Sequence, residues 1–219
     1  MQIIPNSFPQ IPQDSFFLMG KDGLLEVASS WPDQNLAKAI MIICHPHPLH
    51  GGAMTNKVVT TVMRASHHEG LATLRFNFRG VGKSEGTYGY TQGEADDLKS
   101  VLSWVLEVLP ETPVFISGFS FGSYIAAKVA NEKNFASLII SIAPPVNHFT
   151  FSYFSEILAN WWVIQGDKDE IVPFDQVEAW VEEMPNFPQL ITLKDATHFF
   201  HGKLLELQQN IQMIIKKMI

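Results

Sequence analysis

The strongest constraint on the fold is an alternation that runs along most of the chain. Short apolar runs, bounded by Gly, Pro or polar residues, are separated by longer segments whose apolar residues recur at spacings of three and four. The later runs are apolar almost throughout, which is typical of parallel strands that are covered on both faces. The pattern predicts strands over 15–19, 24–28, 39–44, 71–77, 113–117, 137–142, 161–165 and 189–193, and helices over 56–69, 92–108, 121–131, 174–184 and 200–218.

Strands that alternate with helices predict a doubly wound sheet with right-handed crossovers. The first two strands flank Gly20-Lys21-Asp22-Gly23, which reads as a hairpin turn, so they are expected to form an antiparallel edge. We therefore predict an α/β fold with one mostly parallel sheet of about eight strands. The chain of 219 residues suits a single domain over 1–219.

One of the predicted strands runs directly into a Gly-x-Ser-x-Gly motif. The motif consists of Gly118, Ser120 and Gly122, and it follows a β-branched and aromatic run and precedes a helical segment. A nucleophilic serine needs such a tight strand-to-helix turn, because the turn projects the hydroxyl above the sheet. Small flanking residues let the turn close without clashes. Ser120 is therefore the candidate nucleophile, and an ordinary glycine-rich turn with a helix-capping serine is the plainer alternative.

A serine hydroxyl needs a base, and the base needs an acid that orients it. In folds with this turn, the chain order is serine, acid, histidine. Asp169 follows the predicted strand 161–165 and leads into the next helix, so we predict that it is the acid, with Asp167 as the local alternative. His198 follows the last strand and is the predicted base. His201 is the other candidate, but it is expected to start the final helix and to face away.

The loop after the third predicted strand contains His45-Pro46-His47-Pro48-Leu49-His50. An oxyanion hole of this type takes one backbone N–H from that loop and one from the residue after the nucleophile. Proline has no N–H to offer, so the backbone of His47 is the predicted first donor. Phe121 is the predicted second donor.

The same loop also permits a metal-dependent reading. His45, His47 and His50 resemble the H-x-H-x-x-H ligand run of zinc hydrolases on the metallo-β-lactamase fold. That run usually carries an aspartate where this chain has Leu49, so the sequence favours no metal and no cofactor. Cys44 is expected to be inert, because a buried cysteine at the end of a strand is normally unreactive.

Together these segments resemble the α/β-hydrolase superfamily, and more closely a group of small bacterial hydrolases. The matching stretches are 45–52, 74–86, 118–122 and 198–202, and the resemblance extends from about Gly20 onward. It implies the α/β-hydrolase fold, a Ser-His-Asp mechanism and no cofactor, but it implies no substrate. The Arg79-Gly80-x-Gly82-x-Ser84 loop is common in this superfamily and is expected to support the floor of the site rather than to bind an anion.

Many relatives insert a helical lid between the sixth and seventh strands. Here only about fifteen residues, 146–160, are available. They are expected to form at most a small aromatic flap, with a connecting helix as the simpler alternative. The predicted site is therefore open and shallow, with a minimal lid or none, and suited to short acyl groups or to the end of a larger molecule.

Composition bounds the partners and the location. A net charge of −7 argues against nucleic acid as a partner. The single cysteine forms no internal disulfide, and residues 1–20 contain three prolines and no basic start, so we expect a cytoplasmic protein without a signal peptide. No run is long enough to span a bilayer, and the apolar residues of 211–217 are expected to be the buried stripe of the last helix.

The prediction is a serine hydrolase that acts on a small-molecule carboxylic ester or thioester through an acyl-enzyme. Two alternatives remain open. One is a non-catalytic interaction module with the same fold, which a fluorophosphonate probe would not label at Ser120. The other is a metal-dependent hydrolase that uses His45, His47 and His50.

Overall fold

The computed structural model describes residues 16–32, 37–185 and 187–219. The expectation that the chain starts without a signal peptide depends on residues that lie mostly outside these ranges. The predicted first strand also begins at Ser15, one residue before the described part.

The sheet has eight strands in the order β1-β2-β4-β3-β5-β6-β7-β8. The first two neighbouring pairs, β1·β2 and β2·β4, are antiparallel, and the other five are parallel, which confirms the predicted mostly parallel sheet with an antiparallel edge. Gly20 pairs with Gly23 at the predicted hairpin. The strands are β1 (Phe16–Gly20), β2 (Gly23–Ser30), β3 (Ile40–Cys44), β4 (Ala72–Phe76), β5 (Val114–Phe119), β6 (Ala136–Ile142), β7 (Asn160–Gly166) and β8 (Gln189–Leu193).

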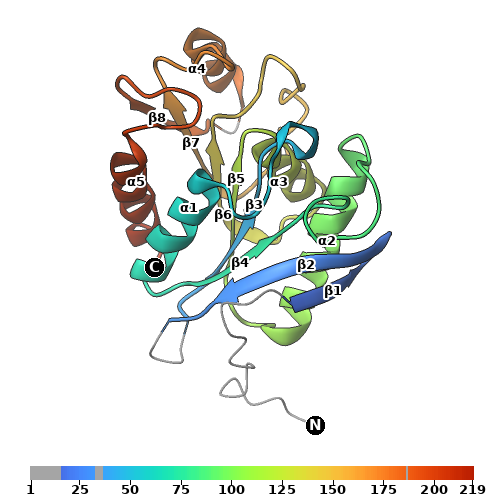
Figure 1. The fold of residues 1–219 in the computed structure, drawn as a ribbon. Coiled ribbons are helices and arrows are strands. Elements are labelled where there is room, and N and C mark those ends of the chain that lie inside the picture. The colour runs from blue at the N-terminus through green and yellow to red at the C-terminus, as the bar shows by residue number, and fades with distance from the viewer. Residues whose placement is uncertain (1–15, 33–36, 186) are drawn as a thin grey trace.

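Helices cover both faces of the sheet (Figure 1). Residues of α1 and α5 share one buried cluster with strands of the sheet, whereas residues of α2, α3 and α4 belong to the clusters on the opposite face. The sandwich follows from the fully buried strands, since a strand such as β3 must be shielded from water on both sides. The helices are α1 (Lys57–His68), α2 (Gln92–Val108), α3 (Phe121–Glu132), α4 (Phe174–Glu183) and α5 (Leu204–Lys216).

Strand β3 illustrates how the two faces divide the core. Met41 and Ile43 pack in the cluster with α1 and α5, while Ile42 and Cys44 pack in the cluster with α2 and α3. This alternation is the period of two that a strand imposes on its side chains. Both faces of the central strands are thus apolar, and chemistry is left to the loops at the strand ends.

Two predicted elements differ in the structure. The last helix begins at Leu204, so the predicted start at residue 200 is wrong. Phe200 has a φ of 53° and Gly202 a φ of 72°, which are left-handed and not helical values. Phe200 is fully buried in the same cluster as Leu207. In the sequence, this apolar residue therefore looks like one more residue on the buried face of the last helix.

The segment between β6 and β7 contains no helix, so the connecting helix considered for 146–160 is wrong. Two of its aromatic side chains, Phe151 and Phe154, are buried in the cluster that includes Trp161, whereas Tyr153 is exposed. No lid domain is present among the described residues, because this segment runs in turns along the edge of the site. None of the helices described is long and apolar enough to cross a membrane.

Candidate active site

Ser120 lies on the sharp turn between β5 and α3. Its φ of 51° and ψ of −121° fall in a region that residues other than glycine rarely adopt. A Cβ atom at Gly118 would lie 2.3 Å from the carbonyl carbon of Gly122, and one at Gly122 would lie 2.4 Å from the carbonyl oxygen of Cys44. Both positions therefore require glycine. The contact at Gly122 also presses the start of α3 against the end of β3.

The structure brings together the three residues predicted as a triad. The Nε2 atom of His198 lies 3.2 Å from Ser120 Oγ, and its Nδ1 atom lies 2.8 Å from Asp169 Oδ2. The residues come from the β5–α3 turn, the β7–α4 loop and the β8–α5 loop, which all follow carboxyl ends of parallel strands. His198 and Asp169 are buried, with exposures of 3% and 8%, whereas Ser120 is partly exposed.

The hydrogen bonds of Asp169 assign the protons on His198. Asp169 Oδ1 accepts from the backbone N–H groups of Ile171 and Val172, at 2.9 and 2.7 Å. An ionised carboxylate only accepts hydrogen bonds, so the Nδ1 atom of neutral His198 carries the proton. Its Nε2 atom is then left with a lone pair directed at the hydroxyl of Ser120, as a general base requires.

Sequence reasoning missed Gln165, whose side chain holds the carboxylate of Asp169 in place by a hydrogen bond. Its Nε2 group donates to Asp169 Oδ2 and to the carbonyl of Val172, both at 3.0 Å. The only signal was a polar residue near the end of an otherwise apolar strand. Asp167, the alternative acid, points elsewhere: its Oδ1 atom accepts from the backbone N–H of Asp195 at 2.6 Å. Asp167 thus ties two loops together and makes no contact with His198 among those described.

The loop that carries His198 is anchored by aromatic rings. Phe200 is fully buried, and the rings of Phe119 and Phe199 lie 5.2 and 5.1 Å from the imidazole of His198. His201, the alternative base, lies on the exposed turn before α5 and not inside the helix. Burial of its neighbours holds His198 over the end of β5, whereas His201 faces solvent.

The loop after β3 lies beside the β5–α3 turn. The loop carries His47, the first predicted oxyanion donor, and the turn leads into Phe121, the second. The His47 carbonyl accepts from the backbone N–H groups of His50 and Gly52, both at 3.0 Å, across a short 3-10 turn, η2 (Pro48–His50). The backbone N–H of His47 has no acceptor in the part of the chain that the structure describes. Phe121 is the first residue of α3, so its N–H has no helical carbonyl in reach. The rings of His47 and Phe121 lie 4.8 Å apart.

The metal-dependent reading of the three histidines fails at His45. Its Nδ1 atom lies 2.6 Å from the carbonyl of Pro46, and its Nε2 atom accepts from the backbone N–H of Phe78 at 3.0 Å. Both ring nitrogens are therefore used, and burial lowers the pKa of His45 to about 4. This ring holds two loops together and has no lone pair left for a metal. The described residues contain no group of three His, Cys, Asp or Glu side chains placed to hold a metal ion.

His47 has a different environment. Its Nδ1 atom accepts from the backbone N–H of Leu49 at 3.2 Å, so Nε2 carries the proton and faces the hydroxyl of Tyr88 at 3.3 Å. Burial, with the charge of His50 beside it, lowers the pKa of His47. Tyr88 was not found by sequence reasoning, because no local pattern relates it to the loop after β3.

The loop that brings Tyr88 to the site is fixed by Arg79. The guanidinium donates to Asp97 from Nε at 3.0 Å and from Nη2 at 2.7 Å, and Nη1 donates to Asp22 at 3.2 Å. Ser84 Oγ donates to the Asn77 carbonyl at 2.7 Å. The guanidinium is already paired with two carboxylates, so these contacts favour the expected structural role over an anion site.

Cys44, the other nucleophile considered, is fully buried in β3. Burial raises the pKa of its thiol far above the usual range, which keeps it protonated and unreactive. Ser120 instead borders a cavity of about 270 Å³. The cavity is lined by His47, His50, Ser120, Phe121, Pro145, His148, Phe149 and Ile171.

The fold is that of α/β hydrolases, and comparison with known proteins places the chain in this family. The family model described as "Alpha/beta hydrolase domain" matches residues 37–219, so the chain belongs to this family. The chain is also 34% identical over 181 residues to an uncharacterised protein of Rickettsia prowazekii, a match that covers 78% of this chain and 76% of that protein.

Solved structures agree in detail. An α/β serine hydrolase homologue from Coxiella burnetii superposes with a TM-score of 0.90 at 44% identity, covering 93% of this chain and 97% of the other. A protein from Xanthomonas campestris, described as an α/β serine hydrolase without a lid, gives a TM-score of 0.88 at 38% identity, with 95% and 96% covered. The chain is thus similar to serine hydrolases over nearly its whole length.

Proposed function

We propose that the protein is a serine hydrolase that cleaves carboxylic esters, or thioesters, by acyl transfer to Ser120. The observation that carries the proposal is the continuous hydrogen-bonded chain from Ser120 Oγ through His198 to Asp169. A hydroxyl becomes a useful nucleophile when an oriented base removes its proton. Similarity to serine hydrolases supports the same chemistry.

In the proposed reaction, His198 Nε2 takes the hydroxyl proton as Ser120 Oγ attacks the carbonyl carbon. The backbone N–H groups of His47 and Phe121 donate to the oxyanion, and each such donor is worth about 3–4 kcal/mol of the barrier. Asp169 stabilises the imidazolium, which then protonates the leaving alcohol or thiol. Water, deprotonated by His198, releases the acid and restores the hydroxyl of Ser120.

The cavity beside Ser120 bounds the acyl group. Its volume of about 270 Å³ and its lining by Phe121, Pro145, Phe149 and Ile171 support a short apolar acyl chain. We expect p-nitrophenyl acetate and butyrate to be hydrolysed faster than p-nitrophenyl palmitate, and a strong preference for palmitate would contradict this.

We further propose that residues 1–219 form one domain, since β1–β8 form one sheet. We also propose a cytoplasmic location, since Cys44 is the single cysteine and can form no internal disulfide.

The proposal is tested by hydrolysis of p-nitrophenyl butyrate and of a butyryl thioester, by the unchanged protein and by Ser120→Ala. Loss of at least roughly 10⁴-fold in kcat for Ser120→Ala is expected, with no effect of EDTA on the unchanged protein. Activity that survives Ser120→Ala but disappears with EDTA would overturn the proposal in favour of a metal-dependent reaction. The absence of hydrolysis and of probe labelling in the unchanged protein would support a non-catalytic module.

A further inference from the structure

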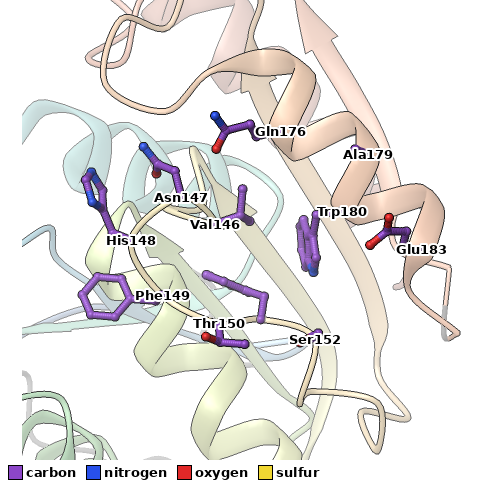
Figure 2. Close-up of a pocket in the computed structure, with 11 residues that line it drawn as sticks. Val146, Asn147, His148, Phe149, Thr150, Ser152, Gln176, Ala179, Trp180 and Glu183 are labelled. Atoms are coloured by element: carbon purple, nitrogen blue, oxygen red, sulfur yellow. The ribbon is translucent and has the colours of Figure 1, made fainter.

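A second hollow lies close to the cleft beside Ser120, on the other side of residues 146–149. It is formed between residues 146–152 and α4, and its volume is about 460 Å³ (Figure 2). His148 and Phe149 line both hollows, so the two adjoin across one stretch of backbone. Nothing in the proposed mechanism uses this larger space.

The two hollows differ in chemistry. Phe121, Pro145 and Ile171 line only the cleft beside Ser120. The second hollow has apolar walls too, but its polar lining is the amide of Gln176, the hydroxyls of Thr150 and Ser152, the carboxylate of Glu183 and the amide of Asn147, whose Nδ2 group donates to the Ile171 carbonyl. No Lys or Arg is among the described residues that line it, so an anionic group would meet Glu183 without a countercharge. Ligand hydroxyls both donate and accept, which matches this mixture of amides, hydroxyls and a carboxylate.

Trp180 adds a donor that the protein itself does not satisfy. It projects from α4 toward residues 146–152, and its ring lies 5.0 Å from that of Phe151 (Figure 2). Its indole Nε1 group is buried and has no hydrogen-bond partner among the described residues. A buried polar group without a partner is unfavourable, and a ligand oxygen that reaches this atom after a small movement of the ring would remove that penalty.

We propose that the second hollow binds the alcohol part of the substrate, and that this alcohol is a neutral, hydroxyl-rich group such as a sugar or polyol. This inference rests on the proposed function, because it assigns the two halves of an ester to two adjoining spaces. The apolar cleft takes the acyl chain beside Ser120, and the polar hollow takes the alcohol. Together they reach the size usual for small-molecule sites.

The test uses exposed residues, so that folding is not disturbed. Glu183 and Gln176 lie on the exposed side of α4 and line the hollow. Glu182 is exposed on the same helix but does not line it, so Glu182→Gln is the matched control. We would measure kcat and KM for a glucose monobutyrate and for p-nitrophenyl butyrate, which carry the same acyl group on different alcohols.

The double variant Glu183→Gln, Gln176→Ala is expected to lose about tenfold in kcat/KM on the glucose ester, mainly through KM. On p-nitrophenyl butyrate it should stay within about twofold of the unchanged protein, and Glu182→Gln should do so on both esters. Trp180→Phe keeps a ring but removes the N–H, so it should also weaken the glucose ester selectively.

Three results would overturn the inference and leave the proposed function standing. They are equal losses on both esters, no loss on the glucose ester, and failure of the unchanged protein to hydrolyse the glucose ester while it hydrolyses p-nitrophenyl butyrate. A cationic ester, butyrylcholine, is the further arm: a larger effect of Glu183→Gln on it than on the glucose ester would mean that the hollow binds a cation. Survival of p-nitrophenyl butyrate hydrolysis in Ser120→Ala would instead overturn the proposed function.

Discussion

Two regions border the cleft beside Ser120, and they are built in different ways. The elbow region, residues 44–52 and 118–122, is held by direct backbone contact, such as that between Gly122 and the Cys44 carbonyl. The aromatic segment, residues 146–159, has no helix or strand and is held by packed rings. Phe149 stacks on Tyr124 with ring centres 4.7 Å apart, and Phe151 lies 5.0 Å from Trp180.

Under the proposed function, the elbow region carries the chemistry and the aromatic segment contributes to substrate specificity. Backbone contact without intervening side chains fixes the elbow region closely, which suits groups that must meet a reacting carbonyl. Ring packing keeps the wall of the aromatic segment in place but leaves its remaining side chains free to vary. We therefore expect changes in the elbow region and the triad to be severe, and changes at exposed residues of the aromatic segment to be mild.

The largest effect is expected for Asp169→Asn, because an amide donates where His198 needs an acceptor and so favours the wrong tautomer. A loss of roughly 10⁴-fold in kcat on p-nitrophenyl butyrate is expected. Asp167→Asn, in the same loop, is the matched control and should change kcat by no more than about threefold. Similar losses for both variants would contradict the assignment of Asp169 as the acid.

Gly122→Ala is the next strongest expected change. The added Cβ would lie 2.4 Å from the Cys44 carbonyl oxygen, and forcing such a contact costs about 3 kcal/mol in the free energy of unfolding. Gly202→Ala, with a φ of 72° but no atom within 4 Å of its Cβ, should lose only about 1 kcal/mol. Urea denaturation measures both. Equal losses would mean that the elbow is no tighter than an ordinary exposed turn.

Much of this region is readable from the sequence, for physical reasons. The strands are buried on both faces, so their apolar runs stand out, and Gly118 is required by contacts local to the turn. The order of Ser120, Asp169 and His198 follows from the order of the strand ends, and these three side chains are the ones the structure brings together.

Features that depend on distant contacts were not readable. Gln165 reaches Asp169, and Tyr88 reaches His47, only once the sheet has assembled. Phe200 is buried by tertiary packing and not as part of a helix. The sequence prediction therefore started the last helix at residue 200, before its actual start at Leu204. The apolar residues of the aromatic segment recur at neither helical nor strand spacing. Neither the path of this segment nor the hollow beside α4 could therefore be predicted.

His45, in the elbow region, should also lower the free energy of unfolding at acid pH. Burial lowers the pKa of His45 to about 4, below its value in an unfolded chain, so the unfolded state binds the proton first as pH falls. The stabilisation is present above about pH 6.5 and is lost toward pH 4, and it amounts to about 2 kcal/mol between pH 7 and pH 4.5.

Urea denaturation at both pH values, on the unchanged protein and on His45→Gln, isolates this contribution from other titrating groups. The variant is expected to be less stable at neutral pH but to lose about 2 kcal/mol less on acidification. An identical acid dependence in the two proteins would show that a neutral His45 ring is not what joins the loops.

The smallest effect is expected in the aromatic segment. The side chain of Asn147 donates to the carbonyl of Ile171 at 2.9 Å, in an exposed position. Asn147→Ala should lower the free energy of unfolding by about 1 kcal/mol or less, since the freed carbonyl can bind water. The kcat on p-nitrophenyl butyrate should change by less than about threefold. A loss as large as that of Gly122→Ala would erase the contrast between the two regions.

The most direct measurement is covalent labelling with a fluorophosphonate probe, with the modified peptide located by mass spectrometry. An activated serine attacks the phosphorus atom, displaces fluoride and remains covalently modified. Labelling therefore reports the nucleophilicity of the serine and does not depend on knowing the substrate. We predict one adduct, on Ser120, that is abolished by Ser120→Ala and greatly slowed by His198→Ala. An unlabelled protein, or an adduct on another residue that persists in Ser120→Ala, would contradict the account.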